Sequence, residues 1–224
     1  MCGRKTLTKD RENIIRTFQV DWWEGEPTWE PHYNISPLMQ VPVLFFDGQR
    51  IVRLMTWGLI PHWAKDEKIA SKLINARAET LLQKLSFAGL VEKNRCIVIT
   101  DGYYEWKKEG ESSIPFYIKS KDDSFLPMAG LYDLWKKPEG NIVYTYTVIT
   151  VDSNPQIGEI HHRMPAILKI EDIEPWINCL KYPFSRVKHL LKPYEHELEV
   201  YPVSKIVNYS RNNSPLCIKR IDYQ

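Results

Sequence analysis

Short apolar runs rich in β-branched and aromatic residues fill the second half of the chain, and they constrain the fold more than any other feature. Runs of this composition, separated by turn residues, form β-strands. Five of them follow residue 94: 95–100 (RCIVIT), 114–119 (IPFYIK), 125–135 (FLPMAGLYDLW), 142–151 (IVYTYTVITV) and 164–168 (MPAIL). So many consecutive short strands predict a mainly antiparallel, barrel-like sheet.

Helical patterns separate these runs and precede them. Residues 8–19 show apolar residues at helical spacing, and residues 76–92 make the longest such pattern, with Asn75 placed as its N-cap. We also expect a hairpin over 41–57 around Asp47-Gly48, a short helix in 153–160, two short helices within 171–192, and a last strand at 198–204. The sequence therefore predicts an α+β fold: a single domain over residues 1–224 with several inserted helices.

Composition excludes several classes of protein. The formal charge of +2 and a pI near 8.2 are too mild for a strongly basic nucleic-acid binder, so any site for a polyanion must be a local groove. The first twenty residues contain no apolar run, and no stretch reaches the roughly 20 apolar residues that span a bilayer. The four cysteines lie far apart, which indicates neither a zinc site nor a disulfide framework. We expect a cytoplasmic protein, associated with the nucleoid if it is bacterial.

Cys2 is unusual because it directly follows the initiator methionine. If Met1 is removed, the chain begins with an amine and a thiol on adjacent carbons, a pair that reacts specifically with aldehydes. The terminal amine, with a pKa of about 7.7 to 8.0, can form a Schiff base near neutral pH, and the thiolate can then close a five-membered thiazolidine ring. Cys96 and Cys217 lie in apolar runs instead, where buried, inert thiols are expected.

Three further stretches carry residues suited to chemistry, each with a plain structural alternative. In 73–80 (LINARAET), Asn75 and Arg77 suit a phosphate site, although Asn75 could simply cap a helix. In 100–108 (TDGYYEWKK), packing of Glu105 against its aromatic neighbours would raise its pKa, unless it faces water at a strand end. In 159–168 (EIHHRMPAIL), one of His161 and His162 suits acid–base work, and a solvated turn is the alternative.

A fourth stretch, 57–65 (WGLIPHWAK), places Trp57 and Trp63 around a glycine and a proline. Exposed aromatic rings in such a loop would offer a surface on which unpaired bases stack, whereas burial in the core is the usual fate of tryptophan. No role follows for His62 from the sequence.

These stretches together resemble the SRAP family (SOS response-associated peptidase domain), whose members shield abasic sites in single-stranded DNA. The resemblance rests on MCGR at 1–4, YNISP at 33–37, WGLIPHWAK at 57–65, NARAE at 75–79, GYYEW at 102–106 and HHRMP at 161–165. It implies that Cys2 is the nucleophile that becomes joined to the aldehyde of a ring-opened abasic site. Strand cleavage by β-elimination from the Schiff base is implied as an accompanying lyase reaction.

The same resemblance implies roles for the other residues. Asn75 would orient the terminal residue and the sugar, Glu105 would shuttle protons, and His161 would assist opening of the deoxyribose ring. Contacts with DNA are implied for a further set: Arg4, Arg77 and Arg163 with phosphates, and Pro37 and Trp63 with bases and the strand junction. The implied partner is single-stranded DNA with abasic sites at replication forks, bound by a monomer without a metal, cofactor or membrane.

Two departures bear on this assignment. His162 stands where the family often has an acidic residue, so the sequence does not separate His161 from His162 by chemistry. A retained Met1 would place the amine of Cys2 in a peptide bond and forbid the ring, so processing is part of the hypothesis. Two alternatives remain open at this point: a cysteine peptidase, whose only activity could be the removal of Met1, and a passive binder of single strands.

Overall fold

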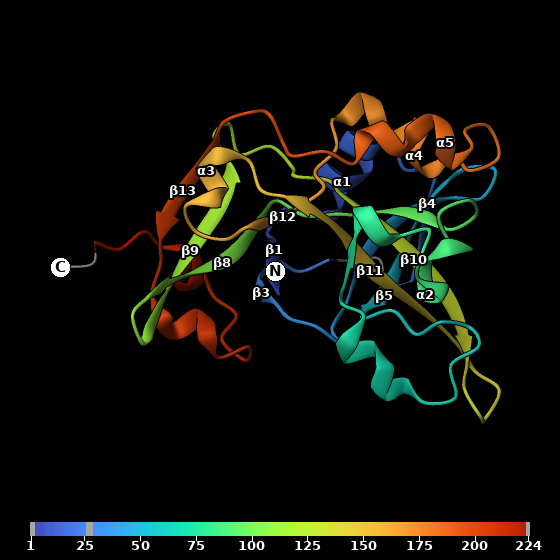
Figure 1. Cartoon of the computed structure of the whole chain (residues 1–224), viewed down its shortest axis with the longest axis horizontal. Coiled ribbons are helices and arrows are strands. Elements are labelled where there is room, and N and C mark those ends of the chain that lie inside the picture. The colour runs from blue at the N-terminus through green and yellow to red at the C-terminus, as the bar shows by residue number, and fades with distance from the viewer. Residues whose placement is uncertain (1–2, 26–28, 223–224) are drawn as a thin grey trace.

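Five strands close a barrel in the computed structural model, which describes residues 3–25 and 29–222 (Figure 1). Around the barrel the order is β4 (Gln40–Phe46), β5 (Arg50–Trp57), β11 (Ile142–Asp152), β10 (Met128–Lys136) and β7 (Arg95–Val98). Neighbours are antiparallel except β5 and β11, which run parallel where Thr56 and Trp57 pair with Thr145 and Tyr146. This parallel contact closes the ring.

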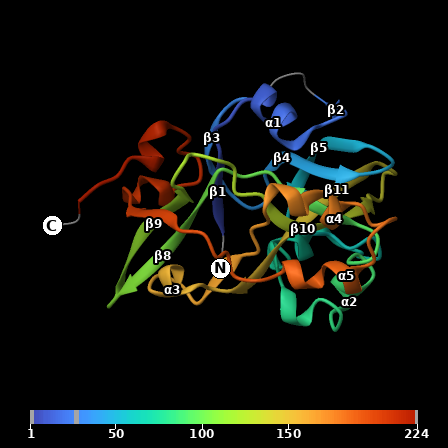
Figure 2. The ribbon, with the colours of Figure 1, turned by 90° about the horizontal axis from the view of Figure 1, so that it is seen from above.

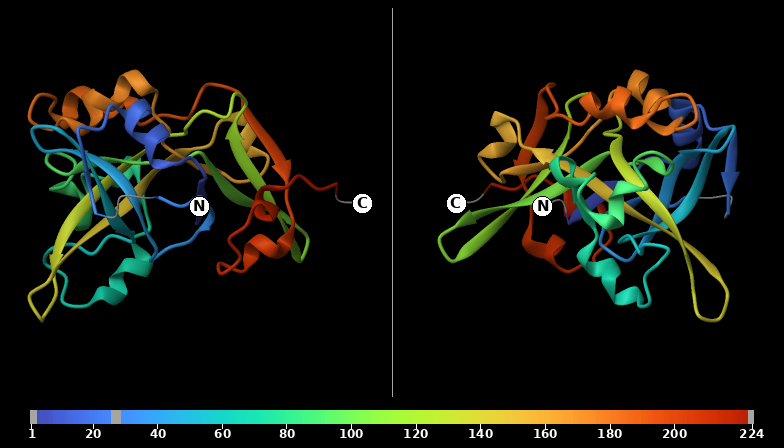
Figure 3. Two further views of the ribbon diagram at one scale, coloured as in Figure 1. Left: turned by 180° about the vertical axis from the view of Figure 1, so that it is seen from behind. Right: turned by 45° about the vertical axis from the view of Figure 1, so that its right-hand side comes forward.

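Three short strands extend the barrel sheet. β2 (Trp22–Glu24) runs parallel to β5, β6 (Asn75–Arg77) runs parallel to β11, and β12 (Arg163–Pro165) is antiparallel to β11. The long strand β11 is buried along most of its length, because it has neighbours along both edges. Figure 3 shows the β10–β11 hairpin projecting beyond the rest of the barrel.

A second sheet of five antiparallel strands lies beside the barrel, on the left in Figure 1 and again in Figure 2. Its order is β13 (Leu198–Pro202), β9 (Ser112–Ser120), β8 (Gly102–Glu109), β1 (Arg4–Leu7) and β3 (His32–Ile35). The chain crosses from β7 to β8 at Asp101, whose carboxylate accepts hydrogen bonds from Thr6 Oγ1 (2.5 Å) and from the backbone N–H of Thr8 (2.6 Å). Asp101 therefore fixes β1 at the junction between the two sheets.

Short helices cover the barrel, with α4 and α5 above it in Figure 1. The α-helices are α1 (Arg11–Phe18), α2 (Leu85–Ala88), α3 (Pro155–Gly158), α4 (Ile173–Ile177) and α5 (Phe184–Val187). The 3-10 helices are η1 (Glu67–Lys72), η2 (Ala78–Thr80), η3 (Ile170–Asp172), η4 (Lys188–Leu190), η5 (Lys205–Asn208) and η6 (Pro215–Ile218). None of the helices within the described residues is long and apolar enough to cross a membrane.

The α+β fold with a barrel-like, mainly antiparallel sheet is confirmed, and so are most of its predicted elements. α1, the β4–β5 hairpin, α3, the helices within 171–192 and β13 all form where the sequence predicts them. The five apolar runs contain β7, β9, β10, β11 and β12. Cys96 and Cys217 are buried, as expected, and burial raises the pKa of the Cys96 thiol well above its ordinary value.

The predicted helix over 76–92 is wrong. Asn75 does not cap a helix, because residues 75–77 form β6, and only η2 and α2 are helical in the remainder of the stretch. The leucines that suggested an amphipathic face are divided: Leu81 is buried, while Leu82 and Leu85 are 64% and 79% exposed. Backbone pairing with β11 therefore overrides a weak helical pattern here.

Arg95 joins three separate segments beneath the helices of the barrel. Its side chain is 1% exposed and donates to three backbone carbonyls: Trp176 (2.5 Å), Val91 (2.6 Å) and Tyr182 (2.5 Å). The guanidinium also lies over the Trp176 ring, 5.5 Å from its centroid. Arg95 therefore supplies donors to helix and turn ends that would otherwise carry buried, unpaired acceptors.

Replacing Arg95 with Met should lower the free energy of unfolding by about 3 kcal/mol or more, because three buried carbonyl oxygens lose their donors. Urea denaturation followed by tryptophan fluorescence measures this change. Arg186→Met on α5 is the matched control, since Arg186 is exposed and its loss should have little effect. Equal stability of the two variants would contradict this role for Arg95.

Candidate functional site

The NARAE and HHRMP stretches meet at one end of β11. On one edge of that strand, Asn75 and Arg77 pair with Val148 and Thr150, and on the other edge Pro165 also pairs with Thr150. A side-chain contact strengthens the junction, because Arg163 Nη1 and Nη2 bind the two oxygens of Glu79 at 2.9 and 3.0 Å. Two segments far apart in the sequence therefore form one surface here.

Arg163 is committed to protein partners at this junction. It is 5% exposed, and beyond Glu79 it donates to Asp152 Oδ1 (2.6 Å) and to the carbonyl of Thr150 (2.6 Å). Its hydrogen bonds hold the pKa of Glu79 below the ordinary value. Arg163 thus acts as a cross-link that fixes the site, and its contact with a phosphate stays a prediction.

His161 is the better oriented of the two adjacent histidines. Its Nδ1 lies 3.0 Å from the backbone nitrogen of Arg163 and 3.1 Å from the Arg163 carbonyl oxygen, and its ring stacks on His162 at a centroid distance of 4.4 Å. Burial lowers the pKa of His161, whereas the side chain of His162 is exposed. His161 is thus the half-buried histidine that the backbone holds, and its role in opening the sugar ring stays a prediction.

Glu105 lies in the middle of β8, and its side chain is 2% exposed. Burial raises the pKa of Glu105 to about 7, which confirms the predicted direction. The predicted cause, desolvation, is also confirmed, but the predicted neighbours are wrong, because Tyr104 and Trp106 alternate to the other face of the strand and pack in a separate cluster with Tyr117. With this pKa the carboxyl group exchanges a proton readily near neutral pH.

Lys5 is a charged residue of this region that the sequence did not single out. It pairs with Tyr103 across β1 and β8, is fully buried, and places Nζ 5.4 Å from the ring centroids of both Trp57 and Tyr146. Trp57 Nε1 in turn donates to the carbonyl of Ile74 (2.9 Å), the residue before Asn75. Lys5 therefore connects the second sheet to the segment that carries Asn75, a tertiary contact with no local sequence signal.

Cys2, the predicted nucleophile, lies outside the described residues. The described chain begins at Gly3 and enters β1, where Arg4 pairs with Tyr104 of β8. The antiparallel register, continued by one residue, places Gly3 opposite Glu105. Glu105 thus lies across from the residue that follows the predicted nucleophile in the sequence.

Arg4 extends to the opposite face of β1 from Lys5. It donates to Asn34 Oδ1 (2.8 Å) and to the carbonyls of Val207 (2.6 Å) and Asn208 (3.1 Å), and burial lowers its pKa. These bonds attach the C-terminal segment to β1. The predicted contact of Arg4 with a phosphate stays a prediction.

The remaining residues predicted to contact DNA lie at or near the surface. Arg77 is exposed, Trp63 is 45% exposed, and Pro37 is partly exposed beside Leu38, which is 57% exposed. Trp57 differs from its predicted place in an exposed loop, because it is fully buried at the end of β5. Leu38 N–H donates to the Trp57 carbonyl (2.8 Å), so the buried tryptophan positions the exposed 36–39 loop.

Among residues 3–25 and 29–222, no group of three His, Cys, Asp or Glu side chains is arranged so that it could hold a metal ion. Among the described residues, Asn75, Glu105 and His161 are suited to proton transfer and to holding a polar ligand, and exposed Arg77 lies on the same short strand as Asn75.

Comparisons with known proteins agree on one family. A family model described as SOS response associated peptidase (SRAP) matches residues 1–210. "Abasic site processing protein YoqW" of Bacillus subtilis is 43% identical over 98% of this chain and 99% of its own length. "Abasic site processing protein HMCES" of Gallus gallus is 34% identical over 99% of this chain and 78% of its own length. A crystal structure of a protein from Bacteroides thetaiotaomicron superposes with a TM-score of 0.88 at 29% identity, covering 98% of this chain and 100% of that one.

Replacing Glu105 with Gln should stabilise the protein above pH 7. The folded-state pKa of about 7 lies above the ordinary 4.5, so the native state binds the proton more tightly and wild-type stability falls as pH rises from about 4.5 to 7. Glutamine does not ionise, so the gain should be near zero at pH 4.5 and about 3 kcal/mol at pH 8. Urea denaturation across this range measures it, with exposed Glu109→Gln as the control. A gain that does not vary with pH would contradict the raised pKa.

Proposed function

The chain belongs to the SRAP family, and from this premise we propose that it captures abasic sites in single-stranded DNA through a covalent bond to Cys2. The names of its relatives support processing of abasic sites. The observation that carries the finer proposal is Glu105, a buried carboxyl group with a pKa of about 7 on the strand beside the start of the chain.

The reaction needs two bond-forming steps and releases one water. After removal of Met1, the amine of Cys2 adds to the C1′ aldehyde of the ring-opened sugar, and the resulting carbinolamine loses water to give a Schiff base. The thiolate then adds to the imine carbon, the imine nitrogen takes up a proton, and a thiazolidine ring results. β-Elimination from the Schiff base would cleave the DNA strand instead, which makes the lyase reaction a branch of the same pathway.

Each proton transfer in this scheme has a candidate group among the described residues. Glu105 in its protonated form can donate to the carbinolamine hydroxyl as it leaves as water, and its carboxylate can take a proton back. His161, neutral because burial lowers its pKa, can accept the hydroxyl proton of the closed sugar so that the ring opens to the aldehyde. Asn75, fixed in β6 by pairing with β11, is placed to hydrogen-bond the sugar.

The surface around these groups suits a single strand. Arg77 supplies an exposed cation beside Asn75, and Trp63 and the 36–39 loop supply apolar surface for unpaired bases. With a formal charge of only +2, the protein should bind undamaged DNA with modest, salt-sensitive affinity, because it can neutralise few phosphates. Stable retention then depends on the covalent bond, which suits a protein that shields a lesion at a replication fork.

Intact-mass spectrometry tests the bond to Cys2. A chain without Met1, incubated with a single-stranded oligonucleotide that carries one abasic site, should gain the mass of the oligonucleotide less one water. Cys2→Ala should form no such adduct, and Cys2→Ser should stop at a reversible Schiff base that heat releases. Cys179→Ser is the matched control, because it removes a thiol from a distant surface position. An equal amount of heat-stable adduct with Cys2→Ser would exclude the thiazolidine.

An added residue before Cys2 separates capture from the peptidase chemistry that the family description names. With the Cys2 nitrogen in a peptide bond, no Schiff base can form at Cys2 and no thiazolidine can close, so the heat-stable adduct should be abolished. A peptidase that acts through the thiol alone needs no free amine and would keep hydrolysing a peptide substrate. A heat-stable adduct of the extended chain would contradict the proposed mechanism, and peptide hydrolysis without any heat-stable adduct would favour the cysteine peptidase.

Glu105→Gln should slow adduct formation at saturating DNA by about a hundredfold or more, the usual contribution of a positioned acid or base. The wild-type rate should depend on pH in two opposing ways. Loss of the Glu105 proton lowers the rate as pH rises through about 7, whereas deprotonation of the terminal ammonium group to the free amine raises it. The variant should retain only the amine's dependence. Single-turnover rates between pH 5.5 and 9 measure this, with exposed Glu111→Gln as the control. Superimposable pH profiles of wild type and Glu105→Gln would remove Glu105 from the mechanism.

A further inference from the structure

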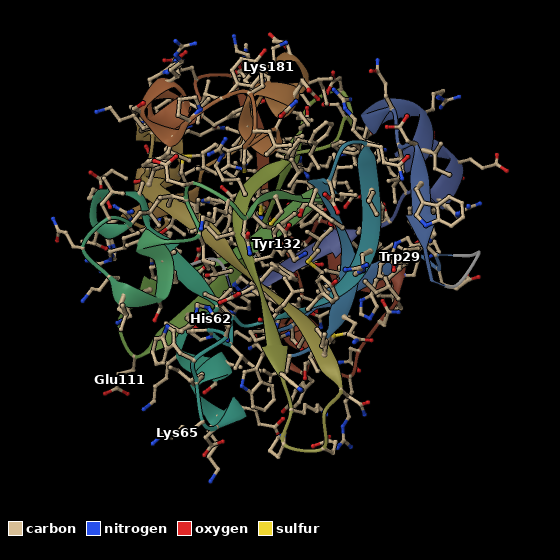
Figure 4. All side chains as sticks on the ribbon, turned by 90° about the vertical axis from the view of Figure 1, so that its right-hand side faces the viewer. Trp29, His62, Lys65, Glu111, Tyr132 and Lys181 are labelled. Carbon is tan, nitrogen blue, oxygen red and sulfur yellow. The ribbon has the colours of Figure 1, made fainter. Side chains whose placement is uncertain are left out.

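His62 of the 58–66 loop pairs with Asp133 of β10, and the proposed chemistry does not use this pair. One carboxylate oxygen of Asp133, Oδ2, accepts from the backbone N–H of His62 (2.8 Å) and lies 3.0 Å from His62 Nδ1. Asp133 is buried in β10, whereas the His62 side chain is 68% exposed. Figure 4 shows His62 on the loop that also carries Lys65, beside the strand of Tyr132. The buried carboxylate therefore holds the ring by Nδ1, and the rest of the imidazole faces outward.

A pocket of about 270 Å³ lies against this pair. Its lining includes His62, Trp63, Leu85, Leu90, Lys93 and Asp133. Trp63 and Leu85, both largely exposed, give it a flat apolar wall, and exposed Lys93 places a cation at its rim. An aromatic wall with basic groups beside it is the combination that binds a nucleotide of a single strand, by its base and its phosphate respectively.

One wall of the pocket is attached beside Asn75. The 58–66 loop is held there through Trp57 Nε1, which donates to Ile74 O (2.9 Å), and through Leu59 N–H, which donates to Leu73 O (3.1 Å). The other wall, 85–94, begins ten residues after Asn75, beyond β6 and η2. Gly58 starts the loop at φ 126°, and a Cβ there would lie 2.7 Å from Ala70 O, so the loop leaves the barrel in this direction only with glycine.

The spacing along β11 fits a neighbouring nucleotide. Asp133 pairs with Thr145, and Asn75 pairs with Val148, three residues further along the same strand. The offset is about 10 Å along β11 and about 10 Å across it, because β10 and β6 pair with opposite edges, so the two residues lie about 14 Å apart, a distance of a few nucleotides along a DNA strand. The pocket is therefore close enough to be reached by the strand that holds the lesion, and too far to hold the lesion itself.

We propose that this pocket, the His62 pocket, binds one nucleotide of single-stranded DNA a few positions from the abasic site. The base packs on Trp63, and a phosphate oxygen is held between His62 Nε2 and Lys93. Asp133 fixes the imidazole through Nδ1, and protonation of His62 on binding would place its charge between the carboxylate and the phosphate, so that the three groups alternate in sign. The inference rests on the proposed function, because it assumes that DNA occupies the adjoining site.

Binding of unreactive oligonucleotides tests the pocket separately from the covalent chemistry. The probes are single strands with a tetrahydrofuran analogue of the abasic site, which cannot open to an aldehyde, lengthened one nucleotide at a time on each side. Once the strand reaches the pocket, His62→Gln should bind about three- to tenfold more weakly than wild type. The negative slope of the logarithm of the association constant against the logarithm of salt concentration should also become less steep by about 0.7, the value for one phosphate on a single strand.

Two further variants and the dependence on length make this test decisive. His62→Lys should retain the salt slope, because it keeps a cation, and His189→Gln, at an exposed histidine on η4, should match wild type. The inference is overturned if His62→Gln binds like wild type at every length. It is also overturned if the loss is the same for the shortest strand, since His62 would then act on the loop or at the lesion. Thermal melts check that each variant is folded.

Failure of the proposed function has a different signature. If wild type forms no adduct with an aldehyde-bearing oligonucleotide, covalent capture is wrong, whatever the binding series shows. If the adduct forms but His62→Gln binds like wild type at every strand length, only the His62 pocket is wrong.

Discussion

Strand β11 is hydrogen-bonded along both edges, and the barrel and the candidate site both depend on this double pairing. One edge pairs with β10 and β12, and the other with β5 and β6. The parallel contact with β5 closes the barrel, while β6 and β12 bring the Asn75 and His161 segments to the same end of the strand. β5 and β6 run in the same direction along one edge of β11, and the 58–74 connection between them carries the exposed Trp63 and His62. Closing the barrel and presenting a binding loop are therefore consequences of one strand arrangement.

Buried charges in this protein are compensated in different ways, and the difference separates structural groups from reactive ones. Arg95 donates to three carbonyls, and Arg163 donates to two carboxylates and a carbonyl. Both remain charged and hold segments together. Glu105 is the group whose pKa burial moves to about 7, into the range where a proton can be exchanged at cellular pH. Displaced pKa values of this kind are typical of functional sites, because a carboxyl group that burial keeps protonated near neutral pH can donate a proton there.

Particular residues show where sequence reasoning succeeded and where it failed. Composition and turn residues were sufficient for β10, β11 and the β4–β5 hairpin, because these strands are apolar, β-branched and aromatic runs bounded by turns, and most of their residues are buried. The same reasoning placed Asn75 at a helix cap, since nothing local indicates that three residues will pair with a strand more than 70 positions away. It predicted the raised pKa of Glu105 but named the wrong neighbours, because flanking residues on a strand point to the opposite face. Lys5 and the His62–Asp133 pair had no sequence signal at all, because their contacts are with residues distant in the chain.

The sequence by itself determined the fold class, most of the elements and the set of residue types suited to chemistry, because these follow from periodicity, turn residues and intrinsic reactivity, which are local properties. Only the tertiary structure decided which of those residues share an environment. It joined Asn75 and His161 across β11, buried Trp57 instead of exposing it, engaged Arg4 and Arg163 with protein partners, and withdrew Glu105 from water. Burial and long-range pairing set pKa values and the availability of charged groups, and both arise only once distant segments have packed together.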